Sequence, residues 1–209
     1  MDIKEELRKL VPAGAFGLLG IERASAEPIG DADLTLLFTD IDDYAALTDR
    51  LGDQDSRRLV RAHDAIVRAG LAAAGGVEVK HTGDGIMAYF SAASRAIGCA
   101  VAVQRAVTNY NREGGHPAEL RLAIGLNSGA PIAENGDLFG TAVIAAARIT
   151  DRAEGNQILI SDVVRQLAAG KGFRTRSLGA EILEGLSEPV PLFEVLWQEE
   201  GSAAVVTVA

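Results

Sequence analysis

Cysteine is nearly absent from this chain, which has Cys99 alone among its 209 residues. A single cysteine cannot form an intramolecular disulfide, and the apolar sequence around it predicts a buried thiol in the reducing cytoplasm. Basic residues are also scarce, since 20 lysines and arginines stand against 29 acidic residues and leave a net charge of −9. This charge repels nucleic-acid phosphates, so we expect no nucleic-acid partner.

Long apolar runs near the N-terminus are missing as well. The longest uncharged stretch there, residues 11–21, covers 11 residues, whereas a membrane-spanning helix needs about 20. We therefore expect no membrane span and no signal peptide. The sequence also lacks a Walker A loop, and its three histidines are not at metal-ligand spacing. Neither a P-loop enzyme nor a transition-metal site is predicted.

The residues that are present fit one main domain, because a 48% hydrophobic content suffices to build a core. We expect residues 1–33 to form a short helix, over 2–10, and a linker that leads into the domain. The domain itself should cover residues 34–197, and residues 198–209 should form a C-terminal tail.

The period of the hydrophobic residues changes repeatedly along the domain, which predicts alternating strands and helices. Residues 82–85 read Thr-Gly-Asp-Gly, a turn-forming sequence that should join its flanking strands as an antiparallel hairpin. The expected strands cover residues 34–38, 77–81, 86–90, 122–126, 158–160 and 192–196, and the expected helices 53–74, 97–110 and 141–149.

Two aspartates stand where expected strands end. Asp40 follows the first strand, and Asp84 lies at the tip of the hairpin. If the two strands are neighbours in one sheet, both carboxylates project from the same region. Mg²⁺ is typically bound by one or two carboxylates together with substrate phosphates. The pair is therefore a candidate site for metal ions that hold a nucleoside triphosphate, and a loop cap and an ordinary Asp-Gly turn are the alternatives.

Four segments occur in an order that is typical of one family. They are Phe-Thr-Asp-Ile at 38–41, Gly-Gly-Val-Glu-Val-Lys-His-Thr-Gly-Asp-Gly at 75–85, Ile-Gly-Leu-Asn-Ser-Gly at 124–129 and Asp-Leu-Phe-Gly-Thr-Ala-Val-Ile-Ala-Ala-Ala-Arg-Ile at 137–149. From about residue 34 to 197 the chain resembles the catalytic domain of class III nucleotidyl cyclases of the bacterial adenylate cyclase type. The resemblance implies an α/β (α+β) fold, a ferredoxin-like α/β sandwich, that works as an antiparallel homodimer with active sites between the protomers.

The same resemblance assigns a metal site. Asp40 and Asp84, with Ile41 beside Asp40, would hold two Mg²⁺ or Mn²⁺ ions per site against the triphosphate of ATP. The ribose 3′-hydroxyl would attack the α-phosphorus, and pyrophosphate would leave. The implied activity is that of an adenylate cyclase, which forms 3′,5′-cyclic AMP.

Two further residues, Lys80 and Asp137, match the base-specifying positions of the family. A lysine ammonium only donates hydrogen bonds, and an aspartate carboxylate only accepts them. Adenine offers an acceptor at N1 and a donor at its N6 amine, which this pair satisfies. Guanine would place its O6 and N1–H against the wrong partners, so the pair predicts ATP as the substrate.

Arg148 matches the arginine that stabilises negative charge on the transferred phosphate. The fixed fork of donors in its guanidinium suits that task. The resemblance implies that one protomer supplies Lys80, Asp137 and Arg148 to the metals held by Asp40 and Asp84 of its partner. A lone copy would then lack a complete site.

Two positions depart from the family pattern. Ile144 stands where the family has an asparagine that orients the ribose, and the loss of one such donor costs on the order of 10²- to 10³-fold in rate. Glu184 stands in place of a lysine that contacts the triphosphate, and a carboxylate there repels phosphate. Two alternatives stay open: a cyclase-like domain that binds a nucleotide or a partner protein without turnover, and a cyclase for another nucleotide such as GTP.

Overall fold

The structure is a computed structural model, and it describes residues 33–198. The helix expected over residues 2–10, and nearly all of the linker and of the C-terminal tail, lie outside these described residues. None of the helices within 33–198 is long and apolar enough to cross a membrane.

Strands and helices alternate along the described chain, as the changing hydrophobic period predicts. In chain order they are β1 (Leu34–Ile41), α2 (Tyr44–Leu51), α3 (Asp53–Ala74), β2 (Val77–His81), β3 (Ile86–Phe90), α4 (Ala93–Glu113), β4 (Leu122–Gly129), β5 (Ile132–Glu134), β6 (Asp137–Phe139), α5 (Thr141–Arg152), β7 (Ile158–Ser161), α6 (Asp162–Leu167), β8 (Thr175–Glu181) and β9 (Val190–Val195).

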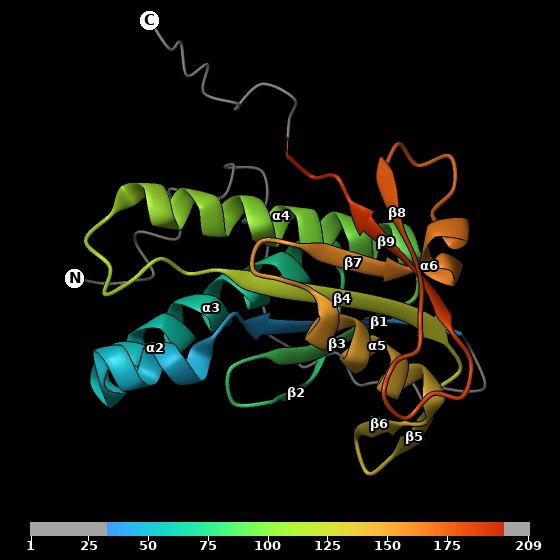
Figure 1. Cartoon of the computed structure of the whole chain (residues 1–209), viewed down its shortest axis with the longest axis horizontal. Coiled ribbons are helices and arrows are strands. Elements are labelled where there is room, and N and C mark those ends of the chain that lie inside the picture. Colours follow the sequence, from blue (N-terminus) through green and yellow to red (C-terminus); the bar gives the residue numbers. More distant parts are fainter. Residues whose placement is uncertain (1–32, 199–209) are drawn as a thin grey trace, which may run out of the picture.

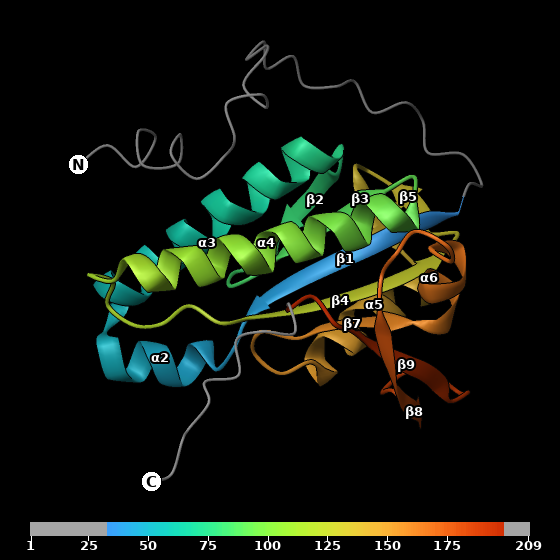
Figure 2. The same cartoon turned by 90° about the horizontal axis from the view of Figure 1, so that it is seen from above.

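Seven of the strands form one sheet in the order β2-β3-β1-β4-β7-β9-β8, and β5 pairs with β6 in a separate two-stranded hairpin. Within the large sheet β4 and β7 are parallel, and the other neighbours are antiparallel. Helices α3 and α4 cover one face of the sheet, and α5 covers the opposite face (Figures 1 and 2). This mixed α/β arrangement confirms the expected fold class.

Alternation along β1 decides which face each of its side chains meets. Leu37 and Ile41 belong to the core beneath α3 and α4, whereas Leu36 packs with Ala146 of α5. Successive side chains of a strand point to opposite faces. Asp40 therefore projects toward the α5 face.

Most of the expected elements are confirmed, and the helix over residues 53–74 has the predicted bounds. The prediction that β1 ends at Phe38 was wrong, because the strand continues to Ile41 and contains Asp40. The cause is the pairing on its two sides. The ladder with β3 stops at Thr39, but the ladder with β4 pairs Asp40 with Ala123 and continues one residue further.

Five short elements, α2, β5, β6, α6 and β8, were not expected from the sequence. In α2 only Leu47 is buried, and β8 has no buried residue, so neither carries a hydrophobic period to detect. The expectation for Cys99 is confirmed, since its side chain is 1% exposed and burial raises the pKa of its thiol to about 12.

A close approach of two backbones joins β1 to the 82–85 turn. A Cβ atom added at Gly85 would lie 1.9 Å from the carbonyl oxygen of Thr39, a backbone atom that cannot rotate away. Only glycine lets the hairpin come this near to the strand that carries Asp40. The absence of a side chain at Gly85 thus permits the turn to lie against β1.

We expect Gly85→Ala to lower the free energy of unfolding by about 2 kcal/mol or more, because the added methyl forces β1 and the turn apart. Gly98→Ala in α4 is the matched control, since a Cβ there meets nothing within 4 Å. It should instead stabilise the helix by a few tenths to 1 kcal/mol. Urea denaturation of both variants measures this, and equal stability of the two would refute the close approach.

Candidate functional site

The structure brings Asp40 and Asp84 together, as the sequence predicts. Strands β1 and β3 are direct neighbours, and the turn that carries Asp84 follows β2 and leads into β3. The two carboxyl groups lie close enough for the negative charge of Asp84 to act on Asp40. The pair therefore concentrates negative charge when both groups are ionised.

Electrostatics at this pair are unfavourable for ionisation. Burial, together with the negative charge and the hydrogen bond of Asp84, raises the pKa of Asp40 to about 7, and the carboxylates of Asp151 and Asp42 act in the same direction. Among residues 33–198 neither Asp40 nor Asp84 forms an ion pair with a lysine, arginine or histidine. The cation that would balance them is not supplied by the described part of this chain.

The neighbouring acids, in contrast, have basic partners. Asp42 accepts a hydrogen bond from Arg121, and Asp151 accepts one from Nη1 of Arg148 over 2.8 Å. The unbalanced charge is thereby confined to Asp40 and Asp84. This local excess is what a divalent cation would relieve.

The ligand set at this place suits Mg²⁺ or Mn²⁺. Two carboxylates without histidine or thiolate are the oxygen donors that these hard ions prefer, and substrate phosphates and water complete their coordination. No group of three or more acidic, histidine or cysteine side chains within residues 33–198 could hold a metal without such help. The side chain of Ile41 is apolar and 1% exposed, so only its backbone oxygen could act as a ligand.

Lys80 and Asp137 also meet in the structure, although 57 residues separate them. Nζ of Lys80 donates to Oδ2 of Asp137 over 2.6 Å, and the ammonium lies 5.8 Å from the ring centroid of Phe139. The hydrogen bond from Lys80 lowers the pKa of Asp137 below its usual range. One chain therefore presents a donor and an acceptor side by side, on β2 and β6.

Arg148 lies on α5 and is partly exposed, with 38% of its side chain accessible. Besides Asp151 it contacts Glu184, with Nε donating to the backbone oxygen over 3.3 Å and Nη2 at 3.6 Å from Oε2. The other departure from the family pattern lies at the same place. The side chain of Ile144 would be 3.6 Å from a Cβ added at Gly185.

These residues form two separate sets within one chain. No hydrogen bond or ion pair among residues 33–198 joins Lys80, Asp137 or Arg148 to Asp40 or Asp84. Two open hollows, of about 470 and 440 Å³, lie elsewhere: one beside residues 154–157 and 194–198, the other between residues 141–145 and 186–191. Neither hollow is lined by any of the predicted site residues.

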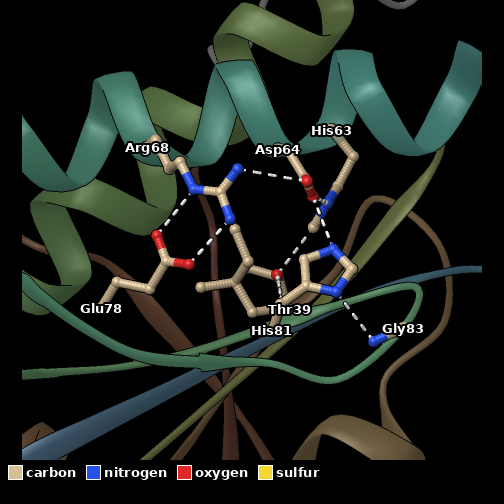
Figure 3. A network of polar contacts seen from close by, with 8 residues as sticks. Thr39, His63, Asp64, Arg68, Glu78, His81 and Gly83 are labelled. Atoms are coloured by element: carbon tan, nitrogen blue, oxygen red, sulfur yellow. Dashed lines mark hydrogen bonds and ion pairs between the residues drawn. The ribbon is translucent and has the colours of Figure 1, made fainter.

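No functional role was predicted for the histidines, yet His81 contacts the turn that carries Asp84 and His63 contacts Thr39 beside it. His63 and His81 both contact Asp64, from α3 and from the hairpin (Figure 3). A signal for His63 was available, because it occupies the buried stripe of α3 between Leu59 and Val67. A polar residue on an apolar stripe indicates a buried partner.

Comparisons with known proteins identify a family model, similar sequences and similar folds. Residues 27–195 match the family model described as the adenylate and guanylate cyclase catalytic domain. The chain is 32% identical over 171 residues to an uncharacterized protein of Mycobacterium tuberculosis, covering 80% of this chain and 43% of that protein. It is 26% identical over 197 residues to an adenylate cyclase of Anabaena cylindrica, covering 84% and 39%.

Among solved structures, an adenylate cyclase of Trypanosoma brucei in its monomeric state superimposes with a TM-score of 0.72 at 21% identity, covering 84% of this chain and 94% of that one. At this identity the likeness concerns the fold. The chain spans less than half the length of the two curated relatives named above.

The raised pKa of Asp40 predicts a pH-dependent stability. Because the folded state holds this proton more tightly than the unfolded state, stability is lost as the pH rises from the ordinary aspartate range to about 7. We expect Asp40→Asn, which mimics the protonated form, to raise the free energy of unfolding at pH 8 by about 1–2 kcal/mol, a value reduced for partial exposure to solvent. The gain should shrink at pH 5.

Urea denaturation in metal-free buffer at the two pH values measures the difference. Asp49→Asn, at an exposed position of α2, serves as the control and should show no pH-dependent gain. An equal gain from Asp40→Asn at pH 5 and pH 8 would contradict the raised pKa of Asp40.

Proposed function

Because this chain belongs to the class III adenylate and guanylate cyclase catalytic domain family, we propose that it converts ATP to 3′,5′-cyclic AMP and pyrophosphate. The observation that carries the proposal is the Asp40–Asp84 pair, two carboxylates that neighbouring strands bring together and that form no ion pair with a basic residue among residues 33–198. Adenylate cyclase is also the printed name of the Anabaena cylindrica relative. The proposal adds substrate and chemistry to the family membership.

Asp40 and Asp84 would hold two Mg²⁺ or Mn²⁺ ions per site, with the backbone oxygen of Ile41 beside them. When bound, such ions lower the pKa of the ribose 3′-hydroxyl and offset charge on the leaving phosphates. The chain orients the substrate so that the 3′-oxygen can bond to the α-phosphorus as the bond to the bridging oxygen of pyrophosphate breaks. The proton of the 3′-hydroxyl passes to water, so no protein side chain is needed as general base.

The base would be selected by Lys80 and Asp137. Their mutual hydrogen bond of 2.6 Å places a donor and an acceptor within one base width, in the polarity that adenine N1 and N6 require. Both side chains are partly exposed, at 44% and 29%. An incoming base can therefore replace their mutual hydrogen bond with hydrogen bonds of its own. This arrangement supports ATP over GTP.

Arg148 would stabilise the charge that develops on the transferred phosphate. Its guanidinium is partly exposed, and among residues 33–198 it contacts the carboxylates of Asp151 and Glu184 and one backbone oxygen. An incoming phosphate can compete for these donors, because a bidentate arginine–phosphate contact is a strong charge-assisted interaction. The pairing with Arg148 also neutralises part of the charge that Glu184 would turn toward the triphosphate.

The two sets of residues would meet in a homodimer. Within residues 33–198 each chain has no basic partner for Asp40 and Asp84, and it carries its own set of Lys80, Asp137 and Arg148 apart from them. The β5–β6 hairpin beside this second set exposes Ile132 and Phe139, at 65% and 45%. Exposed apolar side chains next to an incomplete site favour contact with a second copy.

A second candidate function is a nucleotide-binding or regulatory domain without turnover. Ile144 and Glu184 favour it, since they lie together near Arg148 and neither offers a donor to ribose or phosphate. A third candidate, a cyclase for GTP or another nucleotide, keeps the same metal chemistry. The retained Asp40–Asp84 and Lys80–Asp137 pairs favour the ATP cyclase over both.

The dimeric site predicts complementation. Asp40→Ala and Arg148→Ala should each abolish cyclic AMP formation, because every site of either homodimer lacks one component. In a mixed dimer one cleft contains both substitutions, and the other cleft contains an intact Asp40 and an intact Arg148. With random exchange about half of the dimers are mixed, so activity should recover to about a quarter of the wild-type value.

The mixture is assayed for cyclic AMP after native mass spectrometry has confirmed subunit exchange. The control is Arg105→Ala in α4, mixed with Asp40→Ala. This mixture should keep the activity of every site whose Asp40 comes from an Arg105→Ala chain. Absence of recovery in the Asp40→Ala and Arg148→Ala mixture would show that both residues act within one chain.

A further inference from the structure

The turn that carries Asp84 is held by side chains on both of its sides. The Gly83 N–H donates to Nδ1 of His81 over 3.0 Å, and the Ile86 N–H donates to Oγ1 of Thr39 over 3.1 Å. The first amide precedes Asp84 directly, and the second follows it by two residues. Their partners therefore decide where the turn lies.

Both partners lead to one residue of α3. Oδ1 of Asp64 lies 3.0 Å from Nε2 of His81 and 3.0 Å from Nδ1 of His63. Nε2 of His63 in turn lies 2.8 Å from Oγ1 of Thr39. A single carboxylate oxygen thus ends two chains of hydrogen bonds that begin on either side of Asp84 (Figure 3).

The proton positions follow from donor and acceptor chemistry. An ionised carboxylate only accepts, so the ring nitrogens of His63 and His81 that face Asp64 carry the protons. The opposite nitrogen of each neutral ring is then an acceptor, for the Gly83 N–H in one case and the Thr39 O–H in the other. The Thr39 oxygen keeps a lone pair for the backbone amide, and every contact is satisfied.

Asp64 is itself held firmly. Although burial opposes its ionisation, the hydrogen bonds from His63 and His81 hold the pKa of its carboxyl below the usual range. Its Oδ2 accepts from Nη1 of Arg68 over 3.2 Å, and Arg68 is clamped by both oxygens of Glu78 at 2.7 and 2.8 Å. The side chain of His63 is fully buried. The branch through His63 is therefore shielded from water, whereas the side chain of His81 is 30% exposed.

We propose that Asp64 is a positioning residue of the candidate active site: through His63 and His81 it fixes the two amides that flank Asp84. It acts from the α3 face of the sheet, opposite to the face toward which Asp40 projects, and it contacts no substrate. The inference rests on the proposed function, because it assigns the network a role in metal binding.

Such a restraint is needed because the two carboxylates of the metal pair repel each other when both are ionised. Without a fixed turn, the hairpin tip could relieve the repulsion by moving away from β1. Outer partners that orient metal ligands typically change metal affinity or activity by 10- to 100-fold. The network therefore maintains a geometry that the bound cation would otherwise have to create.

Asp64→Ala should raise the Mn²⁺ concentration for half-maximal cyclic AMP formation by about 10-fold or more, while the KM for ATP at saturating Mn²⁺ changes less than about 3-fold. Asp64→Asn keeps an oxygen acceptor for both ring N–H groups and should stay within about 3-fold of wild type. Ile97→Val, a buried α4 substitution, is the control for a general loss of stability and should leave the Mn²⁺ requirement unchanged.

A second pair of variants tests one branch at a more exposed position. His81→Ala removes the acceptor of the Gly83 N–H and should raise the Mn²⁺ requirement. His81→Asn offers a side-chain oxygen to the amide two residues on, as in an Asx turn, and should restore most of the loss. This pair decides the question if Asp64→Ala does not fold.

Nitrogen-15 NMR of the imidazoles reports on the network without any turnover. In the wild type His81 should be protonated at Nε2, and Asp64→Ala should remove this preference and speed hydrogen exchange of the Gly83 amide. If the wild type forms no cyclic nucleotide, the proposed function fails, and unchanged spectra in Asp64→Ala would then separately overturn the network. If the wild type is active, an unchanged Mn²⁺ requirement in Asp64→Ala, or an equal shift in Ile97→Val, overturns the proposal.

Discussion

The rest of the site depends on one constraint, a pair of carboxylates that lie against each other without a basic partner among residues 33–198. Burial and the negative charge of Asp84 raise the pKa of Asp40 to about 7. The fold keeps the two carboxylates together because the 82–85 turn lies against β1 at Gly85, where no side chain could fit. Such local instability is typical of a functional site, where the preferred ligand supplies the missing interaction.

The same constraint accounts for the division of the site residues into two sets. Lys80 and Asp137 satisfy each other, and Arg148 is paired with Asp151 and Glu184, so the second set is stable without substrate. The metal pair has no comparable partner within the described residues. In a dimer, Lys80, Asp137 and Arg148 of one copy would face Asp40 and Asp84 of the other, with the nucleotide between them. Both sites would then be complete.

Much of this could be predicted from the sequence, because the signals were local. A strand ending near Asp40 and a Thr-Gly-Asp-Gly turn at Asp84 placed two carboxylates at one edge. The meeting of Lys80 with Asp137 depends on tertiary packing, and only the family resemblance could anticipate it. Asp64 was missed because a hydrogen-bond network between a helix and a hairpin leaves no periodic pattern, and the place of His63 on the buried stripe of α3 was not used. Strand β8, which has no buried residue, left no pattern either.

The central claim is that this chain cyclises ATP. The most direct test is to incubate the purified protein with Mn²⁺ and each of ATP, GTP, CTP and UTP separately, and to separate the products by chromatography. We predict 3′,5′-cyclic AMP with stoichiometric pyrophosphate from ATP, and little product from the other three nucleotides. Binding of ATP without any cyclic product, or a preference for GTP, would contradict the account.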